Sequence, residues 1–213
     1  MTQPRTQIEA LATALVRSTQ GMAAAGHCPA TGGNCSARID AQRIWITASG
    51  ADKHRLSRAD LLVVGMDGQL EGQRKPSAET ALHLAVYRQD PQVGAVLHGH
   101  SVAATSLSRH CKQPRLRLEG YEMQKAIAGI DSHEAALDLV VLDNAQDMAP
   151  LAERIRSHWQ AIHRARAFLL RGHGLYSFGR DLQETKRHYD AWEFLLQCEL
   201  QGQVLRQAVG SGS

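Results

Sequence analysis

The sequence lacks several features that would place it in a specialised class of protein. No apolar run approaches the roughly 20 residues that a membrane-spanning helix needs, and residues 1–15 lack the basic stretch and apolar core of a secretory leader. The four cysteines form no C-x-x-C pair, and a domain of this size does not need disulfides, so we expect reduced thiols. These absences predict a cytoplasmic protein that does not span a membrane.

An excess of charge of one sign is also missing. The 24 basic and 21 acidic residues give a formal net charge of +3, spread along the chain rather than clustered. We therefore expect no nucleic acid or membrane surface as a partner, while a small anionic substrate stays open. No linker rich in Pro, Gly or Ser divides the 213 residues, of which 43% are hydrophobic. The sequence predicts a single domain over 1–213, with its core at about 8–205 and a flexible tail at 206–213.

Two histidines end an apolar run in the middle of the chain. The run 95–97 predicts a strand, whose period of two directs the side chains of His98 and His100 to one face. A further histidine, His173, is flanked by glycine on both sides after the predicted strand Ala167–Leu170, so it can approach another strand end closely. His173 is therefore our candidate for a third metal ligand. Taken alone, the pair is explained better by two solvated histidines at a strand end.

Two loops of small and hydroxyl-bearing residues suit an anion. The segment 28–39 contains adjacent glycines followed by Asn34, and the segment 47–53 repeats this chemistry around Ser49 and ends in Lys53. Backbone N–H groups that converge in such loops bind phosphate, although an ordinary tight turn explains either pattern.

Two glutamates are candidates for proton transfer. Ser77 is placed to cap a helix, which puts Glu79 in its first turn. An acid there is commonly a solvated residue favoured by the helix dipole, and the alternative is a carboxylate that projects into a site. Glu122 lies in the segment 119–127, whose mixed pattern predicts a partly exposed helix.

Five short motifs occur in an order that resembles the class II aldolase and adducin-head family. They are G-N-C-S-A-R, I-T-A-S-G, K-P-S-A-E, H-G-H-S and G-H-G-L-Y-S-F-G, and the resemblance covers about residues 8–200. It implies a three-layer α/β/α fold around a mixed, mostly antiparallel sheet, and a homotetramer with active sites at subunit contacts. It also implies one divalent metal ion per subunit, typically Zn2+, held by His98, His100 and His173. Three imidazoles leave coordination positions open, as in catalytic zinc sites.

The resemblance also implies roles for polar residues. The residues that would hold the phosphate of a small sugar-phosphate substrate are Asn34, Thr47, Ser49, Gly50 and Ser77. Glu122 matches the catalytic glutamate of the dehydratases in this family, and Glu79 matches the carboxylate that the aldolases use. The segments 28–31 and 120–127 are most similar to the dehydratases that remove water from 5-methylthioribulose 1-phosphate in methionine salvage, which yields 2,3-diketo-5-methylthiopentyl 1-phosphate.

Two departures and two alternatives accompany this interpretation. Gly99 stands where those dehydratases more often carry a bulkier residue, and Gly32 replaces a more usual serine. A sugar-phosphate aldolase or a pentulose-phosphate 4-epimerase would use the same metal and phosphate sites. A non-catalytic domain of the adducin type would need no metal, so the three histidines argue against it. The eight histidines that we exclude as ligands are His27, His54, His83, His110, His133, His158, His163 and His188.

Overall fold

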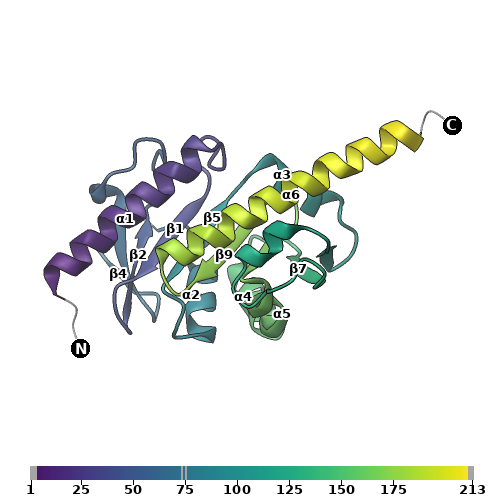
Figure 1. The fold of residues 1–213 in the computed structure, drawn as a ribbon. Helices are drawn as coiled ribbons and strands as arrows, with labels where there is room; N and C mark the ends of the chain where they lie inside the picture. The colour runs from purple at the N-terminus through teal and green to yellow at the C-terminus, as the bar shows by residue number, and fades with distance from the viewer. Residues whose placement is uncertain (1–3, 73, 75, 211–213) are drawn as a thin grey trace.

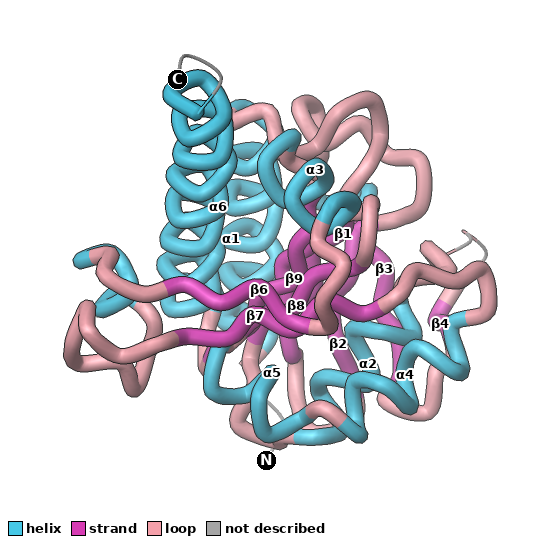
Figure 2. The backbone as a smooth tube through the Cα atoms, turned by 90° about the vertical axis from the view of Figure 1, so that its right-hand side faces the viewer, coloured by secondary structure: helices cyan, strands magenta, loops and turns pink. Residues whose placement is uncertain are grey.

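The computed structural model describes residues 4–72, 74 and 76–210, which fold around one nine-stranded sheet (Figures 1 and 2). The strand order is β4-β3-β2-β1-β5-β9-β8-β7-β6, and neighbours are antiparallel except β7 and β8. The strands are β1 (Asn34–Arg38), β2 (Arg43–Thr47), β3 (Leu61–Gly65), β4 (Leu70–Glu71), β5 (Ala95–Gly99), β6 (Arg115–Leu118), β7 (Leu137–Leu142), β8 (Ala167–Leu170) and β9 (Gly174–Gly179). The sheet is therefore mixed and mostly antiparallel, as expected.

Helices cover both faces of the sheet, which gives three layers (Figure 2). One face carries α1 (Arg5–Ala24), α3 (Val102–His110) and α6 (Leu182–Gly210), and the other carries α2 (Thr80–Gln89), α4 (Met148–Ser157) and α5 (Trp159–Ala165). Two short 3-10 helices complete the elements, η1 (Arg58–Asp60) and η2 (Glu122–Ala126). The expected three-layer α/β/α fold is confirmed.

Strand β5 explains how the sequence encodes a sheet that is buried on both faces. Ala95 and Leu97 pack toward α1 and α6, whereas Val96 packs toward α2 and α4. Because both faces meet an apolar layer, the strand is an unbroken apolar run rather than an alternating one. His98 follows on the face of Val96 and is fully buried. The period of two therefore carries a polar side chain into the end of an apolar layer.

Several elements differ from the expectations. The spacing of apolar residues over 144–162 predicts one helix, but the structure interrupts it at His158, where α4 ends and α5 begins. Residues 174–179, to which we assign no element from the sequence, form β9, which is hydrogen-bonded to β5 on one side and to β8 on the other. The segment 119–127 forms only the short helix η2. The expected tail at 206–213 is helical up to Gly210, and residues 211–213 lie outside the described residues.

The start of α2 also differs. Glu79, rather than Ser77, occupies the position before the first helical residue, Thr80, and the Ser77 hydroxyl accepts a hydrogen bond from the Glu79 N–H at 3.3 Å. Ser101, in contrast, caps α3 by accepting a hydrogen bond from the N–H of Ala104 at 3.1 Å. Among the described residues, no helix is long and apolar enough to cross a membrane.

Candidate metal centre and active site

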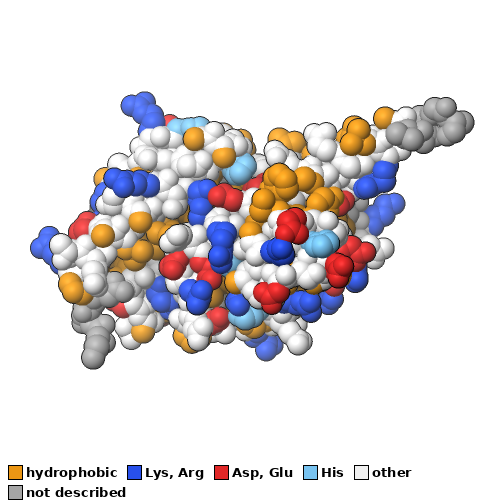
Figure 3. Space-filling view, viewed as in Figure 1, with side chains coloured by type: hydrophobic (Ala, Val, Ile, Leu, Met, Phe, Trp, Pro, Cys, Tyr) orange, Lys and Arg blue, Asp and Glu red, His pale blue; other side chains and the backbone are white. Residues whose placement is uncertain are grey.

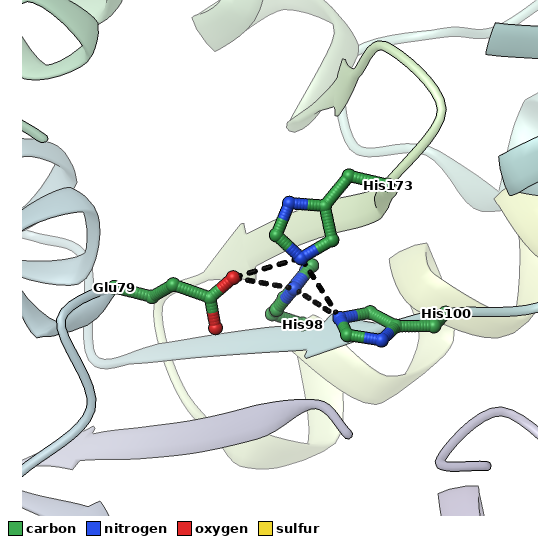
Figure 4. A group of neighbouring side chains, drawn as sticks. All are labelled: Glu79, His98, His100 and His173. Carbon is green, nitrogen blue, oxygen red and sulfur yellow. Dashed lines mark hydrogen bonds and ion pairs between the residues drawn. The ribbon is translucent and has the colours of Figure 1, made fainter. Parts of the chain in front are cut away.

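Four side chains meet at one end of the sheet, where β5 ends and β9 begins. His98 lies in β5, His100 follows that strand, His173 lies in the turn between β8 and β9, and Glu79 precedes α2. They point toward one another (Figure 4), and one ligand atom from each lies within 4.8 Å of all the others. The structure therefore brings together the three predicted histidines and one of the two predicted carboxylates.

The distances within this group, which we call the histidine–glutamate cluster, are short. The Nε2 atom of His100 lies 2.8 Å from Nε2 of His98 and 3.1 Å from Nε2 of His173. The Oε1 atom of Glu79 lies 2.8 Å from Nε2 of His173 and 3.5 Å from Nε2 of His98. Three nitrogens and one carboxylate oxygen thus converge on a common centre, which is a donor set that divalent transition metals bind.

A glycine makes the close approach possible. A Cβ atom on Gly174 would lie 2.2 Å from the carbonyl oxygen of Gly99 and 3.0 Å from Cδ2 of His100. Only a residue without a side chain lets the turn that carries His173 lie against the end of β5. The hydroxyl of Thr105 fixes the same turn by donating to the carbonyl oxygen of His173 at 2.9 Å. The close approach inferred from the flanking glycines is therefore confirmed.

Neighbouring groups orient the rings and set their charge. The Nδ1 atom of His98 lies 2.9 Å from the carbonyl oxygen of Leu175, and because a carbonyl only accepts, Nδ1 donates this hydrogen bond and Nε2 faces the cluster. The ring of Tyr176 stacks on that of His98 at 3.8 Å. Burial, reinforced by His98, lowers the pKa of His100 to about 3, so its imidazole is neutral at pH 7. Neutral imidazoles are the form that binds a metal.

The carboxylate of Glu79 is held in its ionised form. Burial alone would raise its pKa, but hydrogen bonds with His173 and His98 outweigh burial and lower the pKa of Glu79. The amide of Asn34 donates a further hydrogen bond to Oε2 of Glu79. Asn34 lies directly opposite His98 in the pairing of β1 with β5. The structure thus places Asn34 beside the cluster.

The remaining predicted phosphate residues lie at the same end of the sheet. Thr47 ends β2, is fully buried, and its hydroxyl accepts a hydrogen bond from the N–H of Cys35 at 3.2 Å. Ser49 and Gly50 follow it and are exposed. An isolated bridge between Ala48 and Pro76 brings the half-buried Ser77 next to this loop.

Lys53 joins the two small-residue loops. Its ammonium group donates to the carbonyl oxygens of Thr31 and Ala51, both at 2.8 Å, and the residue is 1% exposed. The sequence places Lys53 at the end of the second loop, where it could add a positive charge for an anion. The structure shows that it cross-links the loops.

Glu122 is the predicted residue that the structure does not bring to the cluster. It lies in η2, its side chain is 69% exposed, and its charged neighbours are Lys125 and His133. The hydrogen bond from Lys125 lowers its pKa. Within one chain, therefore, Glu122 contacts none of the four cluster residues.

None of the eight histidines excluded as ligands belongs to the cluster in the described part of the chain. One of them, His83, is nevertheless connected to it, because its Nε2 atom is hydrogen-bonded to Oδ1 of Asn34. Burial lowers the pKa of His83 to about 3. No local pattern in the sequence indicated this contact, since it depends on how α2 packs against β1.

Comparison with known proteins gives consistent results. The family model for the class II aldolase and adducin N-terminal domain matches residues 13–200. The methylthioribulose-1-phosphate dehydratase of Serratia proteamaculans is 47% identical over 193 residues, which cover 90% of this chain and 95% of that relative. The enzyme of the same name from Stenotrophomonas maltophilia is 44% identical over 208 residues, and the match covers 94% of both chains.

Solved structures share the fold. An L-fuculose-1-phosphate aldolase from Thermus thermophilus superposes with a TM-score of 0.74 at 28% identity, covering 94% of this chain and 98% of that one. YgbL from Klebsiella pneumoniae gives a TM-score of 0.77 at 24% identity, covering 90% and 88% of the two chains.

Proposed function

The chain belongs to the class II aldolase and adducin N-terminal domain family, and from that membership we propose that it is a methylthioribulose-1-phosphate dehydratase, a hydro-lyase of methionine salvage. The observation that carries the proposal is near-full-length similarity to relatives of that name at 44–47% identity. The reaction removes a proton from C3 and the hydroxyl from C4 of 5-methylthioribulose 1-phosphate. It releases water and an enol, which tautomerises to 2,3-diketo-5-methylthiopentyl 1-phosphate.

We further propose that His98, His100 and His173 hold a divalent metal ion and that this ion is zinc. The convergence of three imidazoles on one carboxylate supports a divalent ion, and the nitrogen-rich donor set favours zinc over magnesium or calcium. When bound, such an ion supplies a Lewis acid that polarises the substrate carbonyl. Glu79 shapes the site from the fourth side, and its ionised oxygen lies where it can assist a proton transfer.

The phosphate of the substrate would bind beside the cluster. The residues that we propose for it are Asn34, Thr47, Ser49, Gly50 and Ser77. Two observations support these residues. The loops that carry them lie together at one end of β1, β2 and β5, and the buried ammonium group of Lys53 holds two of those loops in place. Backbone N–H groups in a loop that is already fixed can bind the phosphate dianion without the entropy cost of ordering the loop on binding.

We propose that Glu122 takes the C3 proton and that it reaches the cluster from a neighbouring subunit of a homotetramer. Exposed hydrophobic side chains gather over α6 and η2 (Figure 3), where Phe194 is 48% exposed and Met123, next to Glu122, is 39% exposed. Such a patch favours contact with another protein surface. A carboxylate placed there can act as base on C3 and then return the proton to the departing C4 hydroxyl.

We place the enzyme in the cytoplasm because all four cysteines are unpaired in the structure.

Product identification tests the reaction. Purified protein loaded with zinc is incubated with 5-methylthioribulose 1-phosphate, and the products are identified by mass spectrometry and NMR. The diketone phosphate is expected. An aldehyde plus dihydroxyacetone phosphate would identify an aldolase, and an epimeric pentulose phosphate would identify an epimerase; either result would refute the proposal.

Subunit mixing tests the position of Glu122. His98→Ala and Glu122→Gln proteins are each expected to be inactive, and co-refolding them in equal amounts restores about a quarter of wild-type activity if each site takes one residue from each of two subunits. If both residues act within one chain, no mixture regains activity, because every site then lacks one of them.

A further inference from the structure

Behind Glu79, two rows of polar side chains interlock inside the protein. Glu79, His83 and Tyr87 are spaced by four residues along the start and body of α2, so they share one face of that helix. Asn34 and Ser36 are spaced by two along β1, so they share the face that α2 covers. His83 and Ser36 are 0% exposed and Tyr87 is 1% exposed. A continuous polar row is unexpected at such depth unless every member has a partner.

The two rows alternate in one chain of contacts. The hydroxyl of Tyr87 lies 2.9 Å from Oγ of Ser36, and that Oγ lies 2.7 Å from Nδ1 of His83. Nε2 of His83 is hydrogen-bonded to Oδ1 of Asn34, and the amide nitrogen of Asn34 is hydrogen-bonded to Oε2 of Glu79. The chain leads from the interior of the α2 layer to the histidine–glutamate cluster.

Chemistry fixes the direction of each hydrogen bond. An ionised carboxylate only accepts, so Asn34 must direct its N–H group toward Glu79 and its carbonyl toward His83. That carbonyl only accepts, so Nε2 of His83 carries the proton. Burial favours the neutral imidazole, whose Nδ1 is then an acceptor. The Ser36 hydroxyl therefore donates to Nδ1 of His83 and accepts from the hydroxyl of Tyr87.

We propose that His83 is a positioning residue for the dehydration. By accepting from Ser36 on one side and donating to Asn34 on the other, its ring holds the Asn34 amide in the one orientation that presents N–H to Glu79. Without His83 the amide can rotate by half a turn and present its oxygen to the carboxylate, which repels it. The orientation of Glu79 at the cluster thus depends on a histidine that does not touch the cluster. The role of His83 rests on the proposed dehydratase function only where the test measures activity.

Three variants test this inference through activity. His83→Leu removes both hydrogen bonds, and kcat/KM is expected to fall about 10- to 100-fold, as for other residues that orient ligands of a metal site. His83→Gln can still donate to Asn34 and accept from Ser36, and it is expected to stay within about threefold of the wild type. Trp192→Phe is the matched control, because it removes one buried hydrogen bond, from Nε1 to the carbonyl oxygen of Ala165 at 2.8 Å, on the opposite face of the sheet. This variant is expected to lower thermal stability and to leave kcat/KM unchanged.

A second measurement does not depend on turnover. Co2+ added alone to each protein gives a visible absorption spectrum that reports the geometry of its ligands. The spectrum is expected to change in His83→Leu and to match the wild type in His83→Gln and Trp192→Phe. If the wild type shows no dehydratase activity, the proposed function fails while this comparison still tests the role of His83. An unchanged Co2+ spectrum with wild-type kcat/KM in His83→Leu would overturn the inference.

The wild-type protein supplies a third measurement, should His83→Leu not fold. Two-bond 1H–15N correlation of protein labelled with 15N-histidine distinguishes the two neutral tautomers, and the His83 signals are identified by their loss in His83→Gln. The Nε2–H tautomer is expected. The Nδ1–H tautomer would reverse the direction of the hydrogen bonds and overturn the inference.

Discussion

Replacing Gly174 with alanine is expected to damage the fold and the histidine–glutamate cluster together. The added methyl group would lie 2.2 Å from the carbonyl oxygen of Gly99 and 3.1 Å from its carbonyl carbon. Both atoms belong to the backbone of β5, so no side chain can rotate out of the way. Relief requires β5 and β9 to separate at the end where His98, His100 and His173 converge.

The expected loss follows from the cost of overpacking. An extra methyl group in a packed interior costs about 1–3 kcal/mol, and a clash with backbone belongs at the upper end, about 3 kcal/mol. For a chain of this length each kcal/mol corresponds to about 2–4 °C, so the melting temperature is expected to fall by about 6–12 °C. Gly21→Ala is the control. Its methyl group would lie 3.9 Å from Cε of Lys186, an ordinary van der Waals contact, and at this position in the last turn of α1 alanine is favoured over glycine by up to about 1 kcal/mol.

Urea unfolding and zinc affinity, measured by competition with a chelator, check both parts of this prediction. Gly174→Ala is expected to be less stable and to bind zinc more weakly, and Gly21→Ala to be slightly more stable with unchanged affinity. If Gly174→Ala kept both the stability and the zinc affinity of the wild type, the close contact between β5 and β9 would not govern the cluster.

Three further outcomes are expected. His98→Ala is expected to lose both bound metal and turnover, whereas Glu122→Gln is expected to keep its metal and lose turnover. Metal analysis and a rate assay on each protein check this, and an active Glu122→Gln protein would contradict the role of Glu122. Lys53→Met leaves two loop carbonyls unpaired, so the free energy of unfolding in urea is expected to fall by about 1–3 kcal/mol and KM is expected to rise. An unchanged KM would show that these loops do not bind the phosphate. Hydrogen bonds from Arg180 lower the pKa of Glu184 to about 2, so the ion pair stabilises the fold above pH 4.5 and the gain disappears as the pH falls from 4.5 to 2. Because the Arg180 side chain is 74% exposed, solvent screening reduces the contribution of this ion pair to the free energy of unfolding to about 1–2 kcal/mol. The free energy of unfolding of Glu184→Gln should therefore fall less steeply with acid than that of the wild type, and equal slopes for the two proteins would contradict this.

The convergence of the histidines could be predicted because its causes are local. The period of two in β5, continued to the residue after it, orients His98 and His100, and the flanking glycines of His173 remove the side chains that would block its approach. For Glu79, local pattern allowed two interpretations, a solvated acid or a carboxylate in a site. Only the packing of α2 against the sheet decides between them, and it places the carboxylate against His173.

The rest of the arrangement depends on contacts between distant segments. The spacing of His83 and Tyr87 on α2 is visible in the sequence, but the register that inserts His83 between Asn34 and Ser36 is set by tertiary packing. Strand β9 shows the same limit, because its glycines favour a loop until β5 and β8 pair with it on both sides. Glu122 adds a further level, because the role that we propose for it depends on a neighbouring subunit, whose approach no local pattern predicts.

The position of the cluster at the pairing of β5 with β9 has a consequence for the chain as a whole. Strands β1 to β5 come from residues 34–99 and strands β6 to β9 from residues 115–179, so this pairing joins two halves of the sheet that are built from consecutive halves of the sequence. His100 belongs to the first half and His173 to the second. A bound ion would therefore act as a removable cross-link that closes a long loop, much as a disulfide does, in a protein whose cysteines are unpaired. Withdrawing the ion would loosen the hold of one half of the fold on the other.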